Sequence, residues 1–135
     1  MGTMVENFGL NAGKIWKALE KYGPLHKNKL MKTTGLKKED FYTAIGWLAK
    51  ENKICFKEST YCLGESNFDY DVGKDAGKIW DVLYNIKEMD DVYLPKLAGL
   101  SEEKTYCAVG WLAKEGKISA KKIIPKKARI KFEIK

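Results

Sequence analysis

Residues 46–51 read Gly-Trp-Leu-Ala-Lys-Glu, and the same six residues return at 110–115, a shift of 64 positions. At that shift residues 12–57 align with residues 76–121 without a gap, and 22 of the 46 positions are identical. Internal similarity at this level is the signature of a repeated structural unit. The chain is therefore predicted to be a tandem duplication whose two copies share one fold.

The predicted domains are residues 5–64 and 72–135, joined by a short linker. Each unit is long enough to bury one small core. The composition, 44% hydrophobic and 32% charged residues, is typical of a soluble globular protein. No run of 18 or more apolar residues is present, and residues 1–6 lack the apolar core of a signal peptide. We expect a cytoplasmic protein without a membrane span.

Each unit begins with three predicted helices. The first follows a presumed N-cap at Asn11 or Asp75 and carries apolar residues at helical spacing. The second covers about 27–34 and 91–98, and a glycine ends each copy. Pro95 predicts that the second copy is short or kinked, because proline removes a helical hydrogen bond. The third helix, about 38–52 and 102–116, contains the repeated hexapeptide and begins in unit two at the N-cap Ser101.

After the third helix the apolar period changes from 3.6 to 2, which predicts a β-hairpin in each unit. In unit one, a turn at residues 58–59 pairs residue 56 with 61 and residue 54 with 63, so that one face is apolar. This register places Cys55 opposite Cys62, close enough for a disulfide or a soft-metal pair. Three cysteines without a Cys-x-x-Cys motif favour a reducing compartment, so we expect a reduced pair. A single histidine, His26, predicts no metal site, and no cofactor is expected.

The predicted order in each unit is helix, short strand, helix, glycine turn, helix and hairpin. This is the order of a winged helix-turn-helix domain. Each unit also resembles a small bacterial and archaeal family of winged helix-turn-helix domains of unknown function. The resemblance rests on Ala-Gly-Lys-Ile-Trp at 12–16 and 76–80 and on the repeated hexapeptide. The predicted fold class is α+β and mainly helical, with two tandem winged helix-turn-helix domains, each of three helices and a β-hairpin wing. The resemblance implies a fused dimer, a monomeric pseudo-dimer.

The net charge of +7 is unevenly distributed. Residues 1–64 hold 11 lysines and 6 acidic residues, a balance of +5. Residues 65–119 hold 7 lysines and 11 acidic residues, a balance of −4, and residues 120–135 hold 7 basic residues and 1 acidic residue, a balance of +6. Unit one and the C-terminal wing are therefore the parts that favour an anionic partner.

In helix-turn-helix proteins the third helix enters the major groove and the wing contacts phosphates. These roles predict double-stranded DNA as the partner and a role in transcription regulation. Lysine is a point charge, and the open face of unit one's third helix has no Arg, Asn or Gln to read bases, so salt-dependent phosphate contacts should dominate. Asp90, Asp91 and Glu102 make unit two's helices poor phosphate binders. The predicted nucleic-acid-binding residues are Lys27, Lys29, Lys32, Lys37, Lys38, Thr43, Lys50, Lys121, Lys122, Lys126, Lys127, Arg129 and Lys131.

Gly46 and Gly110 lie on helix faces turned away from their own cores. Glycine in a helix costs about 1 kcal/mol relative to alanine, so we expect a close neighbour there: DNA or the other unit's third helix. Trp47 and Trp111 either anchor that interface or fold under their own wings. These four residues are the predicted inter-repeat or partner interface. The alternative function is a protein–protein interaction module whose winged helices pack as a pseudo-dimer and do not bind DNA.

No enzymatic activity is predicted. His26 has no predictable cysteine or acidic partner, and the sequence lacks a phosphate-binding glycine loop.

Overall fold

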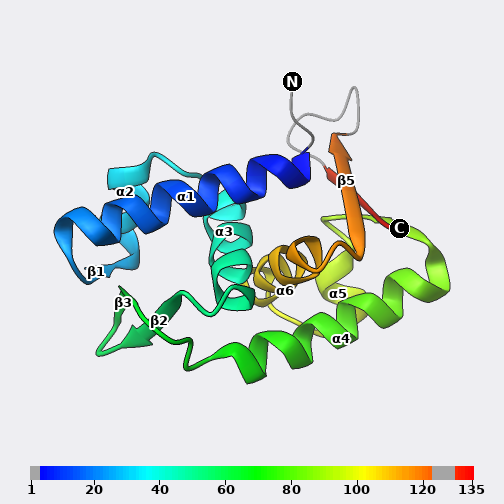
Figure 1. The fold of residues 1–135 in the computed structure, drawn as a ribbon. Helices are drawn as coiled ribbons and strands as arrows, with labels where there is room; N and C mark the ends of the chain where they lie inside the picture. The colour runs from blue at the N-terminus through cyan, green and yellow to red at the C-terminus, as the bar shows by residue number, and fades with distance from the viewer. Residues whose placement is uncertain (1–3, 123–129) are drawn as a thin grey trace.

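The computed structural model describes residues 4–122 and 130–135 and shows the predicted order of elements in both units (Figure 1). Unit one consists of α1 (Met4–Tyr22), β1 (Leu25–His26), α2 (Lys27–Thr34), α3 (Lys38–Lys50), β2 (Ile54–Lys57) and β3 (Thr60–Leu63). Unit two consists of α4 (Asp69–Ile86), β4 (Glu88–Asp90), α5 (Leu94–Ala98), α6 (Glu102–Lys114), β5 (Ile118–Lys122) and β6 (Ile130–Ile134). The predicted fold class, two tandem winged helix-turn-helix domains, is confirmed.

The first helix of each unit begins earlier than predicted. Asn11 and Asp75 lie inside α1 and α4, so the expectation that they are N-caps is wrong. The reason is an additional apolar residue upstream in each copy: Phe8 and Val72 are buried and extend the core-facing stripe by one turn. Burial of that stripe, rather than a capping side chain, decides where these helices begin.

The turn and cap residues of the later helices behave as predicted. Gly35 and Gly99 follow α2 and α5 with φ of 71° and 69°, the left-handed conformation that glycine adopts without strain. Pro95 lies in the first turn of α5, where its missing N–H is not needed, and α5 is accordingly short. Ser101 caps α6 by accepting a hydrogen bond from the backbone N–H of Lys104 at 3.1 Å.

Each unit has a three-stranded antiparallel sheet, ordered β1-β3-β2 in unit one and β4-β6-β5 in unit two. The predicted register is confirmed, since Phe56 pairs with Tyr61 and Ile54 with Leu63. The turn between β2 and β3 has positive φ at both central residues, 50° and 65°, which suits the right-handed twist of a two-residue hairpin. The apolar face is only partly covered, because Phe56 remains 43% exposed.

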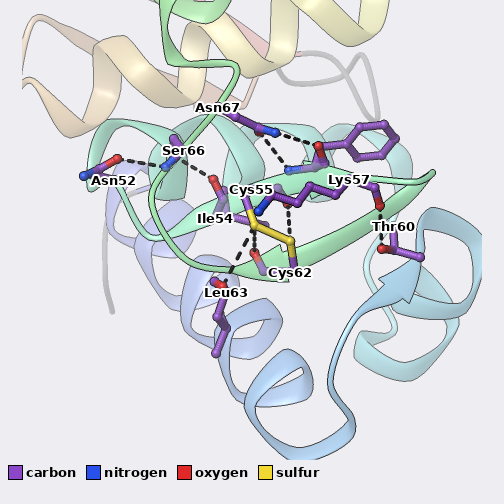
Figure 2. The surroundings of a disulfide bond; sticks show 10 residues. Asn52, Ile54, Cys55, Lys57, Thr60, Cys62, Leu63, Ser66 and Asn67 are labelled. Carbon is purple, nitrogen blue, oxygen red and sulfur yellow. Dashed lines mark hydrogen bonds between the residues drawn. A yellow bond between two sulfur atoms is a disulfide. The ribbon is translucent and has the colours of Figure 1, made fainter.

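The hairpin of unit one carries a disulfide bond between Cys55 and Cys62 (Figure 2). The expectation of a reduced pair is therefore wrong. The two residues are direct partners across the β2–β3 ladder and their Cα atoms are 5.2 Å apart, a separation that a disulfide spans. The expected reducing compartment, which was based on three cysteines without a Cys-x-x-Cys motif, stays a prediction.

The two units pack against each other through their third helices. α3 and α6 cross at the centre of the molecule, with α1 along one side and α4 along the other (Figure 1). One continuous cluster of buried residues runs through both units and includes Ile45 and Leu48 from α3 and Val109 and Leu112 from α6. The two copies therefore share a single core, as a fused dimer would.

Neither a membrane span nor a metal centre is found in residues 4–122 and 130–135. No helix there is long and apolar enough to cross a bilayer. The same residues contain no group of three or more His, Cys, Asp or Glu side chains that could hold a metal ion.

Candidate functional site

The contact between α3 and α6 is built on the two glycines of the repeated hexapeptide. A Cβ atom placed on Gly46 would overlap the backbone carbonyl of Cys107 and lie 2.9 Å from its Cα. A Cβ atom placed on Gly110 would overlap the carbonyl of Thr43 in the same way. Cys107 is the copy of Thr43 at the shift of 64, so the two contacts are exchanged by a pseudo-two-fold axis. The close neighbour of each glycine is the other unit's third helix.

Charged and aromatic side chains surround this contact in the same reciprocal way. Lys50 lies over the Trp111 ring at 4.9 Å, and Lys114 lies over the Trp47 ring at 5.2 Å. Lys50 also pairs with Glu115 at 3.5 Å, as Lys114 does with Glu51 at 3.5 Å. Each cation on an aromatic face contributes about 0.5–1 kcal/mol at an exposed site. These contacts link the two units around the rim of the buried interface.

Each of these tryptophans also packs against the first helix of its own unit. A Cβ atom placed on Gly9 would lie 2.9 Å from the ring of Trp47, and one placed on Gly73 would lie 3.3 Å from the ring of Trp111. The Trp47 ring therefore lies between α1 and Lys114, and the Trp111 ring lies between α4 and Lys50. Neither sequence-based alternative describes this fully, because each Trp joins its own first helix to the opposite third helix.

The face of α3 that was predicted to be open is buried. Thr43 is 2% exposed, and its hydroxyl donates a hydrogen bond to the backbone carbonyl of Asp40. The expectation that Thr43 approaches DNA is therefore wrong for this fold, since α6 covers it. Lys50, another predicted nucleic-acid-binding residue of α3, contacts Trp111 and Glu115. A third helix in this position cannot enter a major groove, which needs a free helix face.

Lys38, at the start of α3, forms an ion pair with Glu103 of unit two, with Nζ 2.7 Å from Oε1. The hydrogen bond from Lys38 lowers the pKa of Glu103 below its ordinary 4.5, and the same bond raises the pKa of Lys38 above its ordinary 10.5. Because both side chains are about half exposed, the solvent screens this pair strongly.

We expect this pair to stabilise the fold only within a defined pH window. The stabilisation is complete above the ordinary pKa of glutamate and below that of lysine. It disappears as the pH falls through the lowered pKa of Glu103, and again as the pH rises through the raised pKa of Lys38. Urea unfolding of the wild type and Glu103→Gln across pH should show a small difference that vanishes in acid. Glu65→Gln is the control in the exposed linker, and a pH-independent Glu103→Gln difference would contradict the expectation.

Four other predicted lysines of unit one remain exposed. Lys27, Lys29, Lys32 and Lys37 lie on α2 and at the entry to α3, and none takes part in an ion pair with another residue of the described chain. Their predicted role in phosphate binding is compatible with their position. It stays a prediction.

The basic wing of unit two falls mostly outside what the structure describes. Lys126, Lys127 and Arg129 lie outside the described residues, and Lys121 and Lys122 belong to β5. Lys131, on β6, lies 3.1 Å from Glu88. β5 lies near the start of α1 and α2 near its end (Figure 1), so these two basic segments are separated by the length of a helix. The predicted binding role of the wing stays a prediction.

Sequence reasoning missed three lysines on α1 that lie between those segments. Lys14, Lys17 and Lys21 are exposed and recur at i, i+3 and i+7, so they share one face of the helix. The spacing is visible in the sequence, but the charge was assigned to the second and third helices by analogy with groove-binding proteins. These lysines are relevant to phosphate binding because α1 runs between α2 and β5, the two other basic segments (Figure 1).

One acidic residue of unit two differs from its prediction. Asp91 was expected to repel phosphate from the surface, but it is only 4% exposed. It accepts hydrogen bonds from the Tyr106 hydroxyl at 2.9 Å and from the Ile130 backbone N–H at 3.1 Å. Burial, followed by the charge of Asp91, raises the pKa of the Tyr106 phenol, which therefore remains a hydrogen-bond donor at neutral pH. Asp91 is a structural residue that fastens β6 to α6.

Comparison with known proteins agrees with this architecture. The family model described as "Winged helix-turn-helix domain (DUF2582)" matches the chain twice, at residues 3–63 and 67–128. No curated protein and no solved structure shows a significant match to the chain. The two matches together cover most of the sequence and correspond to the two copies seen in the fold. The chain therefore belongs to this family of winged helix-turn-helix domains, as a tandem pair in one polypeptide.

Proposed function

We propose that this protein is a non-catalytic module that binds double-stranded nucleic acid through phosphate contacts and not through an inserted third helix. The observation that carries the proposal is the packing of α3 on α6, which removes the groove-reading faces while it leaves lysines exposed elsewhere on unit one. The side chains that remain available on α1 and α2 are mainly lysines, with the amides of Asn7 and Asn28 beside them and no guanidinium group. Because lysines dominate, binding is expected to depend on salt and to be largely independent of sequence.

The surface that fits this role follows α2 and α1 of unit one. Lysines from both helices are exposed there, and those of α1 run from residue 14 to residue 21, a rise of about 10 Å at 1.5 Å per residue. A ridge of this length spans several phosphates of a duplex, since DNA carries one charge per about 1.7 Å of its axis. The residues are Lys14, Lys17, Lys21, Lys27, Lys29 and Lys32.

Removing three lysines of α2 should weaken binding without altering sequence preference. Lys27→Gln, Lys29→Gln and Lys32→Gln together are expected to reduce the affinity for a mixed-sequence 30-base-pair duplex roughly tenfold to a hundredfold at low salt. The slope of log K against log salt should become less steep by about 2–3, because each lost phosphate contact releases one counterion fewer. Fluorescence anisotropy with a labelled duplex at a series of KCl concentrations measures both quantities.

The matched control changes the same charge in unit two. Lys74, Lys78 and Lys96 are exposed, and their triple replacement by glutamine should leave the affinity nearly unchanged. Equal losses for both triple variants would show that only net charge matters. Two unrelated duplex sequences should bind equally well. Absence of binding at low salt, or a strong preference for one sequence, contradicts the proposal.

A second candidate function is protein binding, favoured by apolar side chains exposed at one end of unit two. Five large apolar residues are exposed there, each with about half of its surface accessible. They belong to the end of α4, to the segment that follows β4, and to α5. Exposed clusters of this kind are frequent at protein–protein interfaces. If no duplex binds at low salt, this surface becomes the preferred candidate. The residues are Tyr84, Ile86, Val92, Tyr93 and Leu97.

A further inference from the structure

A cavity of about 250 Å³ lies where the wing of unit one meets the helices of unit two. Unit one contributes aromatic rings: Tyr42 from α3, Phe56 and Tyr61 from the hairpin, and Phe68 from the linker. The rings of Phe56 and Tyr61 meet edge to face, with centroids 4.9 Å apart. The volume lies just below the range of about 300–1,000 Å³ that holds drug-sized ligands, so the cavity suits a small molecule.

Unit two contributes most of the charge around this cavity. Asp71 and Asp75 are one helical turn apart on α4, and Glu103 comes from α6. Lys104 also lines the cavity, and Lys38 pairs with Glu103, so three carboxylates are opposed by two ammonium groups. Burial, followed by the charges of Asp75 and Glu103, raises the pKa of the Cys107 thiol at the same cavity to about 12. The lining is therefore mostly apolar, and these five side chains together leave one net negative charge.

The wall formed by the wing and linker is held in place by hydrogen bonds (Figure 2). The side chain of Asn67 accepts a hydrogen bond from the backbone N–H of Phe56 at 2.9 Å and donates one to its carbonyl at 2.8 Å. Ser66 donates from its hydroxyl to the carbonyl of Ile54 at 2.7 Å. These bonds hold the linker against β2 and set the positions of Phe56 and Phe68 before any ligand arrives. Binding then costs less conformational entropy.

The duplication supplies an internal comparison. At the shift of 64, Asp71 and Asp75 correspond to Asn7 and Asn11, and Phe56 corresponds to Ala120. The equivalent position in the other half thus lacks these two carboxylates and one ring, and it has Asp40 in place of Lys104.

We propose that this cavity binds a small organic cation, namely an amine or quaternary ammonium group carried on an apolar or aromatic body. Aromatic faces attract such cations through their quadrupoles, and the carboxylates of α4 add direct attraction. The apolar body removes ring surface from water, including that of the half-exposed Phe56. The bound molecule touches both units and stabilises their docking by mass action. This inference does not depend on nucleic-acid binding.

The test is an NMR titration of the ¹⁵N-labelled protein with benzyltrimethylammonium. Benzyl alcohol, which is neutral, and benzoate, which is an anion, serve as comparison probes of similar ring size. The cation should shift the backbone amide signals of Phe56, Phe68 and Cys107, and the neutral probe should bind on the order of tenfold more weakly. Benzoate should cause no shift there, because the carboxylates repel it.

Two variants assign the interaction to the cavity. Asp71→Asn with Asp75→Asn, which reproduces the amides of the other half, should weaken binding of the cation on the order of tenfold. Asp69→Asn with Asp81→Asn changes the same charge on the same helix outside the cavity and should leave the affinity unchanged. Phe56→Ala, at a half-exposed position that tolerates truncation, should also weaken binding. Equal binding of benzyl alcohol, equal effects of both double variants, or no shift with any probe overturns the proposal.

Discussion

Gly46→Ala and Gly110→Ala are each expected to lower the free energy of unfolding by about 2–3 kcal/mol, although alanine is the better helix former. The added methyl group would overlap a backbone carbonyl of the opposite third helix, at Cys107 or Thr43. A backbone carbonyl inside a helix cannot rotate away, so α3 and α6 must separate and lose contacts along their length. This cost exceeds the roughly 1 kcal/mol that alanine gains in helix propensity. Urea unfolding followed by far-ultraviolet circular dichroism measures the change.

Two other helical glycines provide the control. Gly13 and Gly77 lie inside α1 and α4, and a Cβ atom at either position would meet no atom within 4 Å. Gly13→Ala and Gly77→Ala should therefore stabilise the protein by about 0.5–1 kcal/mol. The double variant at Gly46 and Gly110 should cost less than the sum of the single variants, because one separation of the helices relieves both overlaps. If Gly46→Ala stabilised the chain as Gly13→Ala does, the helices would not be in contact in solution.

Tyr106→Phe is expected to destabilise the protein by about 1.5–3 kcal/mol. The phenol donates a hydrogen bond to the nearly inaccessible carboxylate of Asp91 at 2.9 Å. Hydrogen bonds to charged groups are stronger than neutral ones, and a buried carboxylate that loses a donor keeps its desolvation cost. Thermal and urea unfolding of the variant at neutral pH measure the loss.

The duplication again supplies a matched control for this prediction. Tyr42 is the equivalent of Tyr106 and is similarly buried, but Lys27 stands where unit two has Asp91. The ammonium of Lys27 lies 6.0 Å from the centre of the Tyr42 ring. Tyr42→Phe should therefore change stability by no more than about 0.5 kcal/mol. If Tyr42→Phe lost as much stability as Tyr106→Phe, the hydrogen bond to Asp91 would not explain the effect of the Tyr106 hydroxyl.

Local features of the fold could be predicted because they depend on neighbours in the chain. The register of the first hairpin follows from the alternation of apolar residues, with a turn of two residues between the strands. Pro95 shortens α5 because its ring removes the backbone N–H that a helix interior needs. The glycines after α2 and α5 adopt a left-handed conformation that other residues avoid. Asn11 and Asp75 failed as N-caps because burial of upstream apolar residues outweighs one capping bond.

The sequence by itself determined the duplication, the order of elements and the fact that Gly46 and Gly110 need a close neighbour. It could not name that neighbour, because a helical period shows which residues share a face and not what the face contacts. Only the tertiary structure decided that the neighbour is the other third helix, that Thr43 and Asp91 are buried, and that aromatic rings of one unit meet carboxylates of the other. These contacts join residues far apart in the chain, and their energies depend on distances that exist only once both units have docked.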